Sequence, residues 1–368
     1  MSERRRVHVE TGSAAYDVVV GRGVLGEVGE LVHAVARGRR VALVSDSNVS
    51  ELFGVQVGAK LITAGFEVRP ITFHAGEASK NWQVAGELLE AFAEDGLDRL
   101  DTVIALGGGV VGDLVGFSAA TYLRGVDLVQ IPTTLLGQVD SSVGGKTGVD
   151  LRAGKNLAGA FKQPLLVLAD VDALSSLPES EWRSGLAEVA KSAVIDGEEF
   201  TAWLESNADA LLRRDLAAVE EAVVRCVAFK SGVVSTDEKE EGARECLNYG
   251  HTLGHAIENV AGYGVIPHGL AVAEGMRFAV RLAVEASVAS REFVKRQDAI
   301  LDALGLPALS SAWPVNELLV AMHSDKKARS GSVRFVLAES PGTWSCTAVE
   351  DGTIREHLEA WTRSKGRE

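Results

Sequence analysis

Hydrophobic and polar positions follow two different periods along this chain. In the first half, short apolar runs rich in β-branched residues, such as residues 16–21 and 101–106, alternate with longer amphipathic segments, such as residues 81–96. A strand pattern that takes turns with a helix pattern is typical of βαβ units around a mainly parallel sheet. We therefore predict a Rossmann-like α/β domain over residues 1–172.

From about residue 178 the apolar positions recur with the period of a helix instead. Residues 178–195, 215–234 and 269–289 are long, alanine-rich segments of this kind. We place the domain boundary near residue 172 and predict an all-α second domain over residues 173–368.

Composition and charge narrow the classes of protein that fit. The chain has 368 residues, of which 46% are hydrophobic and 24% charged, as in soluble globular proteins. A formal net charge of −14 argues against sequence-independent binding to nucleic acid. The chain has no charge-free run long enough for a membrane span, no apolar core of a signal peptide and only scattered cysteines. We therefore expect a cytoplasmic protein that binds neither nucleic acid nor membranes.

A glycine-rich loop follows one of the predicted strands. Residues 102–117, "TVIALGGGVVGDLVGF", run from an apolar strand through Gly107, Gly109 and Gly112 into a helix. Such glycines let the backbone approach a pyrophosphate, and the helix N-terminus favours anions. A tight turn without a ligand has the same pattern, so the match by itself is weak. Earlier predicted strand ends add further candidates for nucleotide contact, namely Asp46, Asn48, Glu77 and Lys80.

The next segment, residues 131–161, is polar and glycine-rich. It carries Asp140, Lys146, Lys155 and Asn156, with too little apolar periodicity for a packed element. Long polar segments inside an apolar domain are more often functional than structural. Together with Arg124 just upstream, its lysines predict a site that neutralises a phosphate or a carboxylate.

Three histidines and a glutamate raise the question of a metal site. His251 and His255 are four residues apart, so a helix would place them on one face. His268 follows a predicted helix end, and Glu188 lies three residues before Lys191. A catalytic zinc ion takes three nitrogen or oxygen ligands and keeps one position open. Spacing alone leaves open whether His251 pairs with His255 or with His268.

Further polar residues near these histidines could bind an oxyanion. They are Lys230, Arg244, Asn248 and, towards the C-terminus, Lys326.

Several segments of the chain follow one another in the order of the motifs of a known family. Among them are "GGGVVGDLVGF", "IPTTLLGQVDSSVGGKTGVD", "SGLAEVAK", "LNYGHTLGHAIE", "HGLAVAEGM" and "DKKARSG". From about residue 46 to 337 the chain resembles the 3-dehydroquinate synthase family, part of the sugar phosphate cyclase superfamily. The resemblance implies a Rossmann-like N-terminal domain, a helical metal-binding C-terminal domain, tightly held NAD, a divalent metal that is usually zinc, with cobalt as the alternative, and a homodimer.

The resemblance also implies the residues of the site. The metal ligands would be Glu188, His251 and His268, which leaves His255 for proton transfer and for the phosphate. The sugar phosphate substrate would contact Arg124 of the partner subunit together with Asp140, Lys146, Asn156, Lys191, Lys230, Arg244, Asn248, His255 and Lys326. Of these, the catalytic residues would be Asp140, Lys146, Lys191, Lys230 and His255. The NAD contacts would be Asp46, Asn48, Glu77, Lys80, Gly108, Gly109, Val110, Asp113, Thr133, Thr134 and Lys155.

The reaction that the resemblance implies converts 3-deoxy-D-arabino-heptulosonate 7-phosphate to 3-dehydroquinate and phosphate. It combines transient oxidation by NAD, phosphate elimination, re-reduction and intramolecular aldol closure.

Three alternatives stay open beside it. One is aminodehydroquinate synthase or another sugar phosphate cyclase, because Leu270 and the residues after Lys191 depart from the family pattern. The second is a metal-dependent alcohol or polyol dehydrogenase, and the third is a regulatory NAD-binding module without chemistry.

Overall fold

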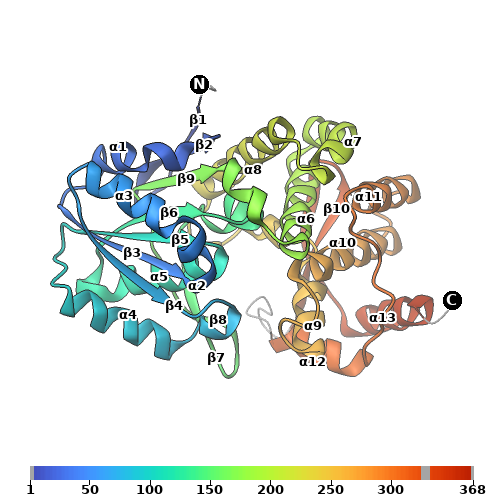
Figure 1. Ribbon diagram of the computed structural model, residues 1–368. Helices are drawn as coiled ribbons and strands as arrows, with labels where there is room; N and C mark the ends of the chain where they lie inside the picture. The colour runs from blue at the N-terminus through green and yellow to red at the C-terminus, as the bar shows by residue number, and fades with distance from the viewer. Residues whose placement is uncertain (1–3, 325–331, 366–368) are drawn as a thin grey trace. The chain divides into compact units, whose positions relative to one another are not determined.

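The computed structural model describes residues 4–324 and 332–365, and the chain divides into two compact units (Figure 1). The first comprises the residues up to 177 together with 219–239, and the second comprises residues 178–218 together with those from 240 onward. This differs from the single boundary expected near residue 172. Helix α8 (Leu216–Thr236) follows that boundary in sequence, yet most of it belongs to the first unit. There the Ser231 hydroxyl donates to the His8 carbonyl at 3.0 Å.

The first unit is built on a seven-stranded sheet with the order β1-β2-β9-β6-β5-β3-β4. β1 pairs with β2 antiparallel, and the other pairs are parallel. The strands are β1 (Arg5–Glu10), β2 (Ala15–Gly21), β3 (Arg40–Asp46), β4 (Glu67–Phe73), β5 (Thr102–Gly107), β6 (Asp127–Pro132) and β9 (Leu166–Asp170). Every residue of β5, β6 and β9 is buried, as expected for parallel strands covered on both faces.

Helices cover both faces of this sheet (Figure 1). The core on one face joins α1 (Val28–His33) and α3 (Val55–Thr63) to the sheet, and that on the other joins α4 (Trp82–Glu94) and α5 (Gly109–Thr121). The neighbouring strands β3 and β5 therefore lead into helices on opposite faces. Ligands of open α/β sheets bind at the carboxyl ends of two such strands.

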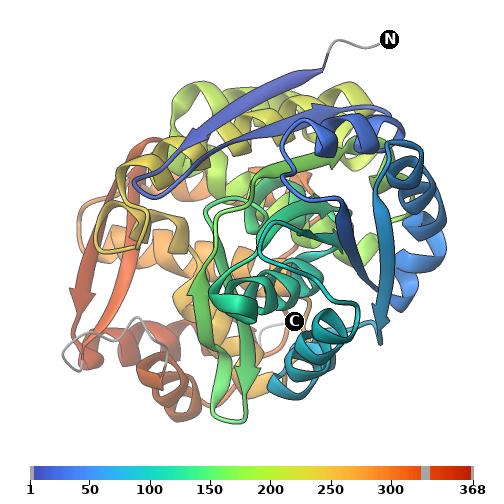
Figure 2. The same cartoon turned by 90° about the vertical axis from the view of Figure 1, so that its left-hand side faces the viewer.

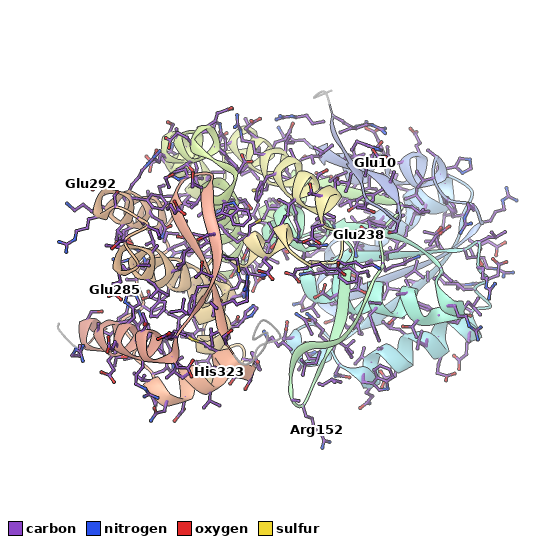
Figure 3. The ribbon with its side chains drawn as sticks, turned by 180° about the vertical axis from the view of Figure 1, so that it is seen from behind. Glu10, Arg152, Glu238, Glu285, Glu292 and His323 are labelled. Carbon is purple, nitrogen blue, oxygen red and sulfur yellow. The ribbon has the colours of Figure 1, made fainter. Side chains whose placement is uncertain are left out.

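Residues 131–161 do form packed elements, contrary to the expectation from their polar composition. They contain the short helical turn η5 (Gly137–Ser141) and an antiparallel hairpin, β7 (Lys146–Leu151) with β8 (Gly154–Phe161). Thr147 and Val149 of β7 are buried, and β7 packs on α5, where Gly116 leaves room for the Thr147 methyl group. The hairpin is the green pair of strands in Figure 2, and Arg152 lies at its tip (Figure 3).

The second unit is helical, with one exception to the all-α prediction. Its helices are α6 (Glu179–Asp196), α7 (Glu198–Leu212), α9 (His251–Ala261), α10 (His268–Glu285), α11 (Arg291–Ala303), α12 (Val315–Ser324) and α13 (Asp351–Lys365). The exception is a hairpin of β10 (Val333–Ser340) and β11 (Thr343–Val349). Val333, Phe335 and Leu337 are alternate residues of β10 and belong to the core of this unit. A strand points all three side chains to one face, whereas a helix would point them in different directions.

None of the helices that the structure describes is both long and apolar enough to cross a membrane.

Candidate active site

The glycine loop joins β5 to α5 in the first unit. Gly108 precedes α5 in an extended conformation, and no side chain caps the first turn of the helix. The first backbone N–H groups of a helix have no partner within it, so this turn can receive an anion. A Cβ atom on Gly108 would lie 2.8 Å from Thr134 Cγ2, so glycine is required for the loop after β6 to approach this closely.

Several of the predicted nucleotide contacts lie at the carboxyl ends of these strands. Gly108, Gly109 and Val110 begin α5, and Thr133 and Thr134 follow β6. The Thr133 hydroxyl is buried and has no hydrogen-bond partner in the described part of the chain. A buried orphan hydroxyl beside an uncapped helix start fits a polar ligand.

The end of β3 adds an acidic residue to this edge of the sheet. Asp46 ends the strand and caps the short helix α2 (Ser47–Val49), where its Oδ1 accepts from the N–H groups of Asn48 and Val49 at 2.9 Å each. Asp46 and Asn48 thus lie at the carboxyl end of β3, the strand next to β5.

Two ion pairs hold the remaining predicted nucleotide contacts. Lys80 Nζ lies 2.6 Å from Asp113 Oδ2, and Lys155 Nζ lies 3.2 Å from Glu77 Oε1. Burial by itself would lower the pKa of Lys80, but the combined attraction to the Asp113 and Glu77 carboxylates is the larger effect and raises that pKa. Lys80 therefore carries a positive charge at neutral pH.

The predicted substrate residues of the first unit are Asp140, Lys230, Lys146, Asn156 and Arg124. Lys230 of α8 pairs with the Asp140 carboxylate, and its Nζ donates to the Asp140 carbonyl at 2.6 Å. Lys146 and Asn156 are exposed on β7 and β8, and Arg124 is exposed on the turn η4 (Tyr122–Arg124). Leu123 and Arg124 both have positive φ, at 49° and 67°, an uncommon conformation for residues other than glycine.

The predicted metal ligands come together in the second unit from three helices. Glu188 lies in α6, while His251 and His268 are the first residues of α9 and α10. Glu188 Oε1 is 3.5 Å from Nε2 of each histidine. This buried oxygen accepts no hydrogen bond from the residues described. A tetrahedral metal with bonds of about 2.1 Å separates its ligand atoms by about 3.4 Å, so the three atoms fit a shared ion.

The other ring nitrogen of each histidine is engaged. His251 Nδ1 lies 3.1 Å from the Tyr249 carbonyl, and His268 Nδ1 lies 3.0 Å from Glu258 Oε2. Both acceptors call for N–H at Nδ1, which leaves Nε2 to face Glu188.

His268 has an unusual affinity for protons. Burial opposes its charged form, but the carboxylates of Glu188 and Glu258 prevail and raise the pKa of His268 to about 10. Any metal ion that binds here must therefore displace a proton from the ring.

Glycines allow these helices to approach closely enough for the ligands to meet. A Cβ atom on Gly269, next to His268, would overlap Ser184 Cα in α6, the helix of Glu188. A Cβ atom on Gly254 would lie 3.1 Å from the Ala271 carbonyl oxygen, where α9 crosses α10. No sequence pattern marks either glycine, although Gly269 stands beside a candidate ligand.

Lys191 and His255 contact the candidate ligands, and Arg244 and Asn248 complete the predicted residues of this unit. Lys191, 2% exposed, pairs with Glu188 on α6, and the His255 ring centroid lies 5.2 Å from that of His251. Arg244, on the turn η7 (Ala243–Asn248), is 1% exposed, and Asn248 Nδ2 donates to Glu240 at 3.0 Å. Lys326 lies outside the described residues.

Family models match residues 70–328, and curated relatives match more than nine-tenths of the chain. The model described as 3-dehydroquinate synthase N-terminal matches residues 70–184, and that described as 3-dehydroquinate synthase C-terminal matches residues 185–328. The chain is 46% identical to a 3-dehydroquinate synthase of Pelobacter propionicus, over 93% of this chain and 94% of that protein. It is 45% identical to a 3-dehydroquinate synthase of Paracoccus denitrificans, over 96% of this chain and 98% of that protein.

Solved structures agree with this relationship. A 2-deoxy-scyllo-inosose synthase in complex with carbaglucose-6-phosphate, NAD+ and Co2+ has a TM-score of 0.89 and 25% identity, covering 97% of this chain and 100% of its own. A 2-epi-5-epi-valiolone synthase from Streptomyces hygroscopicus with NAD+ and Zn2+ bound has a TM-score of 0.87 and 28% identity. The match covers 98% of this chain and 99% of that one. An iron-containing alcohol dehydrogenase from Thermococcus thioreducens, at 17% identity, shares the fold alone. The resemblance seen in the sequence is confirmed, and the chain belongs to the 3-dehydroquinate synthase family.

Proposed function

We propose that this chain converts 3-deoxy-D-arabino-heptulosonate 7-phosphate to 3-dehydroquinate and phosphate. The observation that carries the proposal is the 46% identity, over more than nine-tenths of both chains, to a protein of that name. The two cyclases of other names are only 25% and 28% identical to this chain.

We further propose that NAD binds the β5–α5 loop and that a divalent metal, zinc or cobalt, binds Glu188, His251 and His268. The uncapped helix start, the orphan Thr133 hydroxyl and the spacing of the three ligand atoms support these positions. When bound, NAD supplies a reversible hydride acceptor, and the metal supplies a Lewis acid that favours ionisation of a hydroxyl.

The residues of the chain itself would bind the two anionic groups of the substrate. Arg244 and Lys230 would pair with the carboxylate, because each is a buried cation in a chain of net charge −14. The phosphate would be held by Lys146, Asn248, His255, Lys326 and Arg124 of the partner subunit. Asp140, Asn156 and Lys191 would complete the substrate contacts, and His255 would move the proton that phosphate loss requires.

Buried cations separate this proposal from a polyol dehydrogenase. Lys191, Lys230 and Arg244 are at most 7% exposed. Lys191 and Lys230 already pair with Glu188 and Asp140, and a substrate with a carboxylate and a phosphate offers such cations further anionic partners, whereas an uncharged alcohol offers none. We also propose, from the family resemblance, that the protein is a cytoplasmic homodimer.

The test is phosphate release by the purified protein from the heptulosonate phosphate, with NAD and Zn2+, in parallel with the 4-amino analogue. We expect 3-dehydroquinate and phosphate in equal amounts without net NADH, and loss of both products after the metal is removed by a chelator. Turnover of the amino analogue alone would make the chain an aminodehydroquinate synthase. NADH accumulation with simple polyols would support the dehydrogenase alternative.

A further inference from the structure

We infer that Glu258 is a positioning residue, which orients His268 so that its Nε2 faces the metal position. The inference rests on the proposed metal site and adds to it a residue outside the three ligands. It also gives a role to the glutamate that follows the two histidines in "GHTLGHAIE".

The contacts of Glu258 are those of a buried hydrogen-bond acceptor. Glu258 lies in α9 and is 3% exposed. Its Oε2 accepts a hydrogen bond from Nδ1 of His268 on the neighbouring helix α10. The His268 side chain is 30% exposed, so packing alone leaves its ring partly unconfined. The hydrogen bond therefore restricts rotation of the His268 ring about its side-chain bonds.

A carboxylate at Nδ1 also selects the chemical form of the ring. A neutral imidazole has one N–H and one lone pair, and an acceptor at Nδ1 places the hydrogen there. Nε2 then keeps the lone pair that a metal needs, and the negative charge makes that lone pair more basic. For His251 an uncharged acceptor, the Tyr249 carbonyl, selects the same form.

A different role for Glu258 would be that of a ligand. His255, Glu258 and His268 also offer ligand atoms within 4.8 Å of one another. However, Glu258 Oε2 already accepts from His268 Nδ1, and a metal bound between these atoms would break that hydrogen bond. The contacts therefore favour orientation over ligation.

The second unit contains a control pair that involves α10, the helix of His268. Glu285, near the end of α10 and labelled in Figure 3, lies 2.9 Å from Nδ1 of the buried His357. This is the same pair of groups, but His357 belongs to neither of the candidate metal groups in the described residues. Glu285→Gln thus removes a carboxylate from a histidine without touching the metal site.

The experiment measures metal binding by metal-free protein, without substrate. Zn2+ is titrated into wild type, Glu258→Gln, Glu258→Asp and Glu285→Gln in competition with a coloured chelator, and visible spectra are recorded with Co2+. We expect Glu258→Gln to bind Zn2+ about 10–100-fold more weakly, with an altered Co2+ spectrum, because the ring is less well oriented and less basic. Glu258→Asp should lose less, and Glu285→Gln should bind as wild type does.

Thermal melts of the metal-free proteins separate positioning from a structural role. Unchanged Zn2+ affinity in Glu258→Gln would overturn the inference, whether or not its melting temperature falls. Complete loss of metal at any concentration would make Glu258 a ligand and overturn it as well. If Glu258→Gln does not fold, the same criteria apply to Glu258→Asp. Wild-type protein that binds no Zn2+ would refute the proposed metal site itself, which distinguishes the two failures.

Discussion

His251, His255 and His268 lie close together but have different contacts. His251 and His268 turn Nε2 towards the Glu188 carboxylate, whereas the His255 ring centroid lies 6.1 Å from that of His268. Residue spacing left open which histidine pairs with His251, because a helix brings i and i+4 together whatever they bind. The family resemblance selected His268, and the structure brings that residue to the same carboxylate.

The first prediction follows from this difference between the histidines. His268→Ala should purify without bound metal, because it removes one of three ligands. His255→Ala should retain metal and NAD and lose turnover, because it removes a proton-transfer group. Metal content by elemental analysis and NAD content of the denatured protein check both variants. A metal-free His255→Ala protein would contradict the assignment.

The second prediction concerns the thiol of Cys346. Burial and the neighbouring Glu245 carboxylate raise the pKa of Cys346 to about 11, although Arg334 acts in the opposite direction. Only the thiolate reacts with alkylating agents, so alkylation should be slow at neutral pH and should accelerate up to about pH 11. Glu245→Gln should lower the pKa and speed the reaction at mildly alkaline pH.

Alkylation rates followed by peptide mass spectrometry across the pH range measure this effect. Cys346→Ser identifies which signal belongs to this residue. Fast labelling of Cys346 in the wild-type protein at neutral pH would show that the pKa is not raised.

At the scale of the elements, close helix packing brings the candidate ligands together. We predict that Gly269→Ala destabilises the protein, because its Cβ would collide with the backbone of Ser184 rather than with a movable side chain. Overpacking of this kind typically costs about 1–3 kcal/mol. Weaker Zn2+ binding should accompany the loss, since α6 and α10 carry Glu188 and His268.

Gly86→Ala is the matched control for Gly269→Ala. Gly86 lies inside α4, and a Cβ atom there would have no neighbour within 4 Å. Alanine should stabilise that helix by up to about 1 kcal/mol. Denaturant unfolding and Zn2+ titration compare the two variants, and equal stability changes would refute the packing argument.

Local patterns predicted some elements better than others. Alternation of strand and helix periods predicted the βαβ units, since strands such as β3 and β5 contain short apolar runs. Hairpin β7–β8 was not predicted because glycines such as Gly148 and Gly159 have no side chain and so contribute nothing to an apolar period. Their role is close backbone contact between the two strands, which the sequence pattern does not show. Hairpin β10–β11 was missed because its alternate apolar residues are few and follow a long helical region.

For the whole molecule, the proposed homodimer makes a prediction about mixed subunits. If Arg124 completes the site of the partner subunit, Arg124→Ala and His255→Ala homodimers should both be nearly inactive. Unfolding and refolding them together should restore about a quarter of wild-type activity, because half of the dimers are mixed and each mixed dimer has one intact site.

Activity after refolding, compared with refolded wild type, measures this complementation. Size-exclusion chromatography of each variant shows whether dimers form. Dimers that regain no activity on mixing would place Arg124 in the site of its own subunit.

The sequence by itself determined the fold class, the family and the identity of the candidate residues, because those follow from apolar periods and from polar motifs in a fixed order. It did not determine which unit α8 joins, since a helical period is the same on either side of a boundary. Nor did it reveal Glu258 or Gly269, whose roles depend on contacts between separate helices. Only the tertiary structure decided these points, because hydrogen-bond direction and backbone approach are properties of residues in space and not of their order.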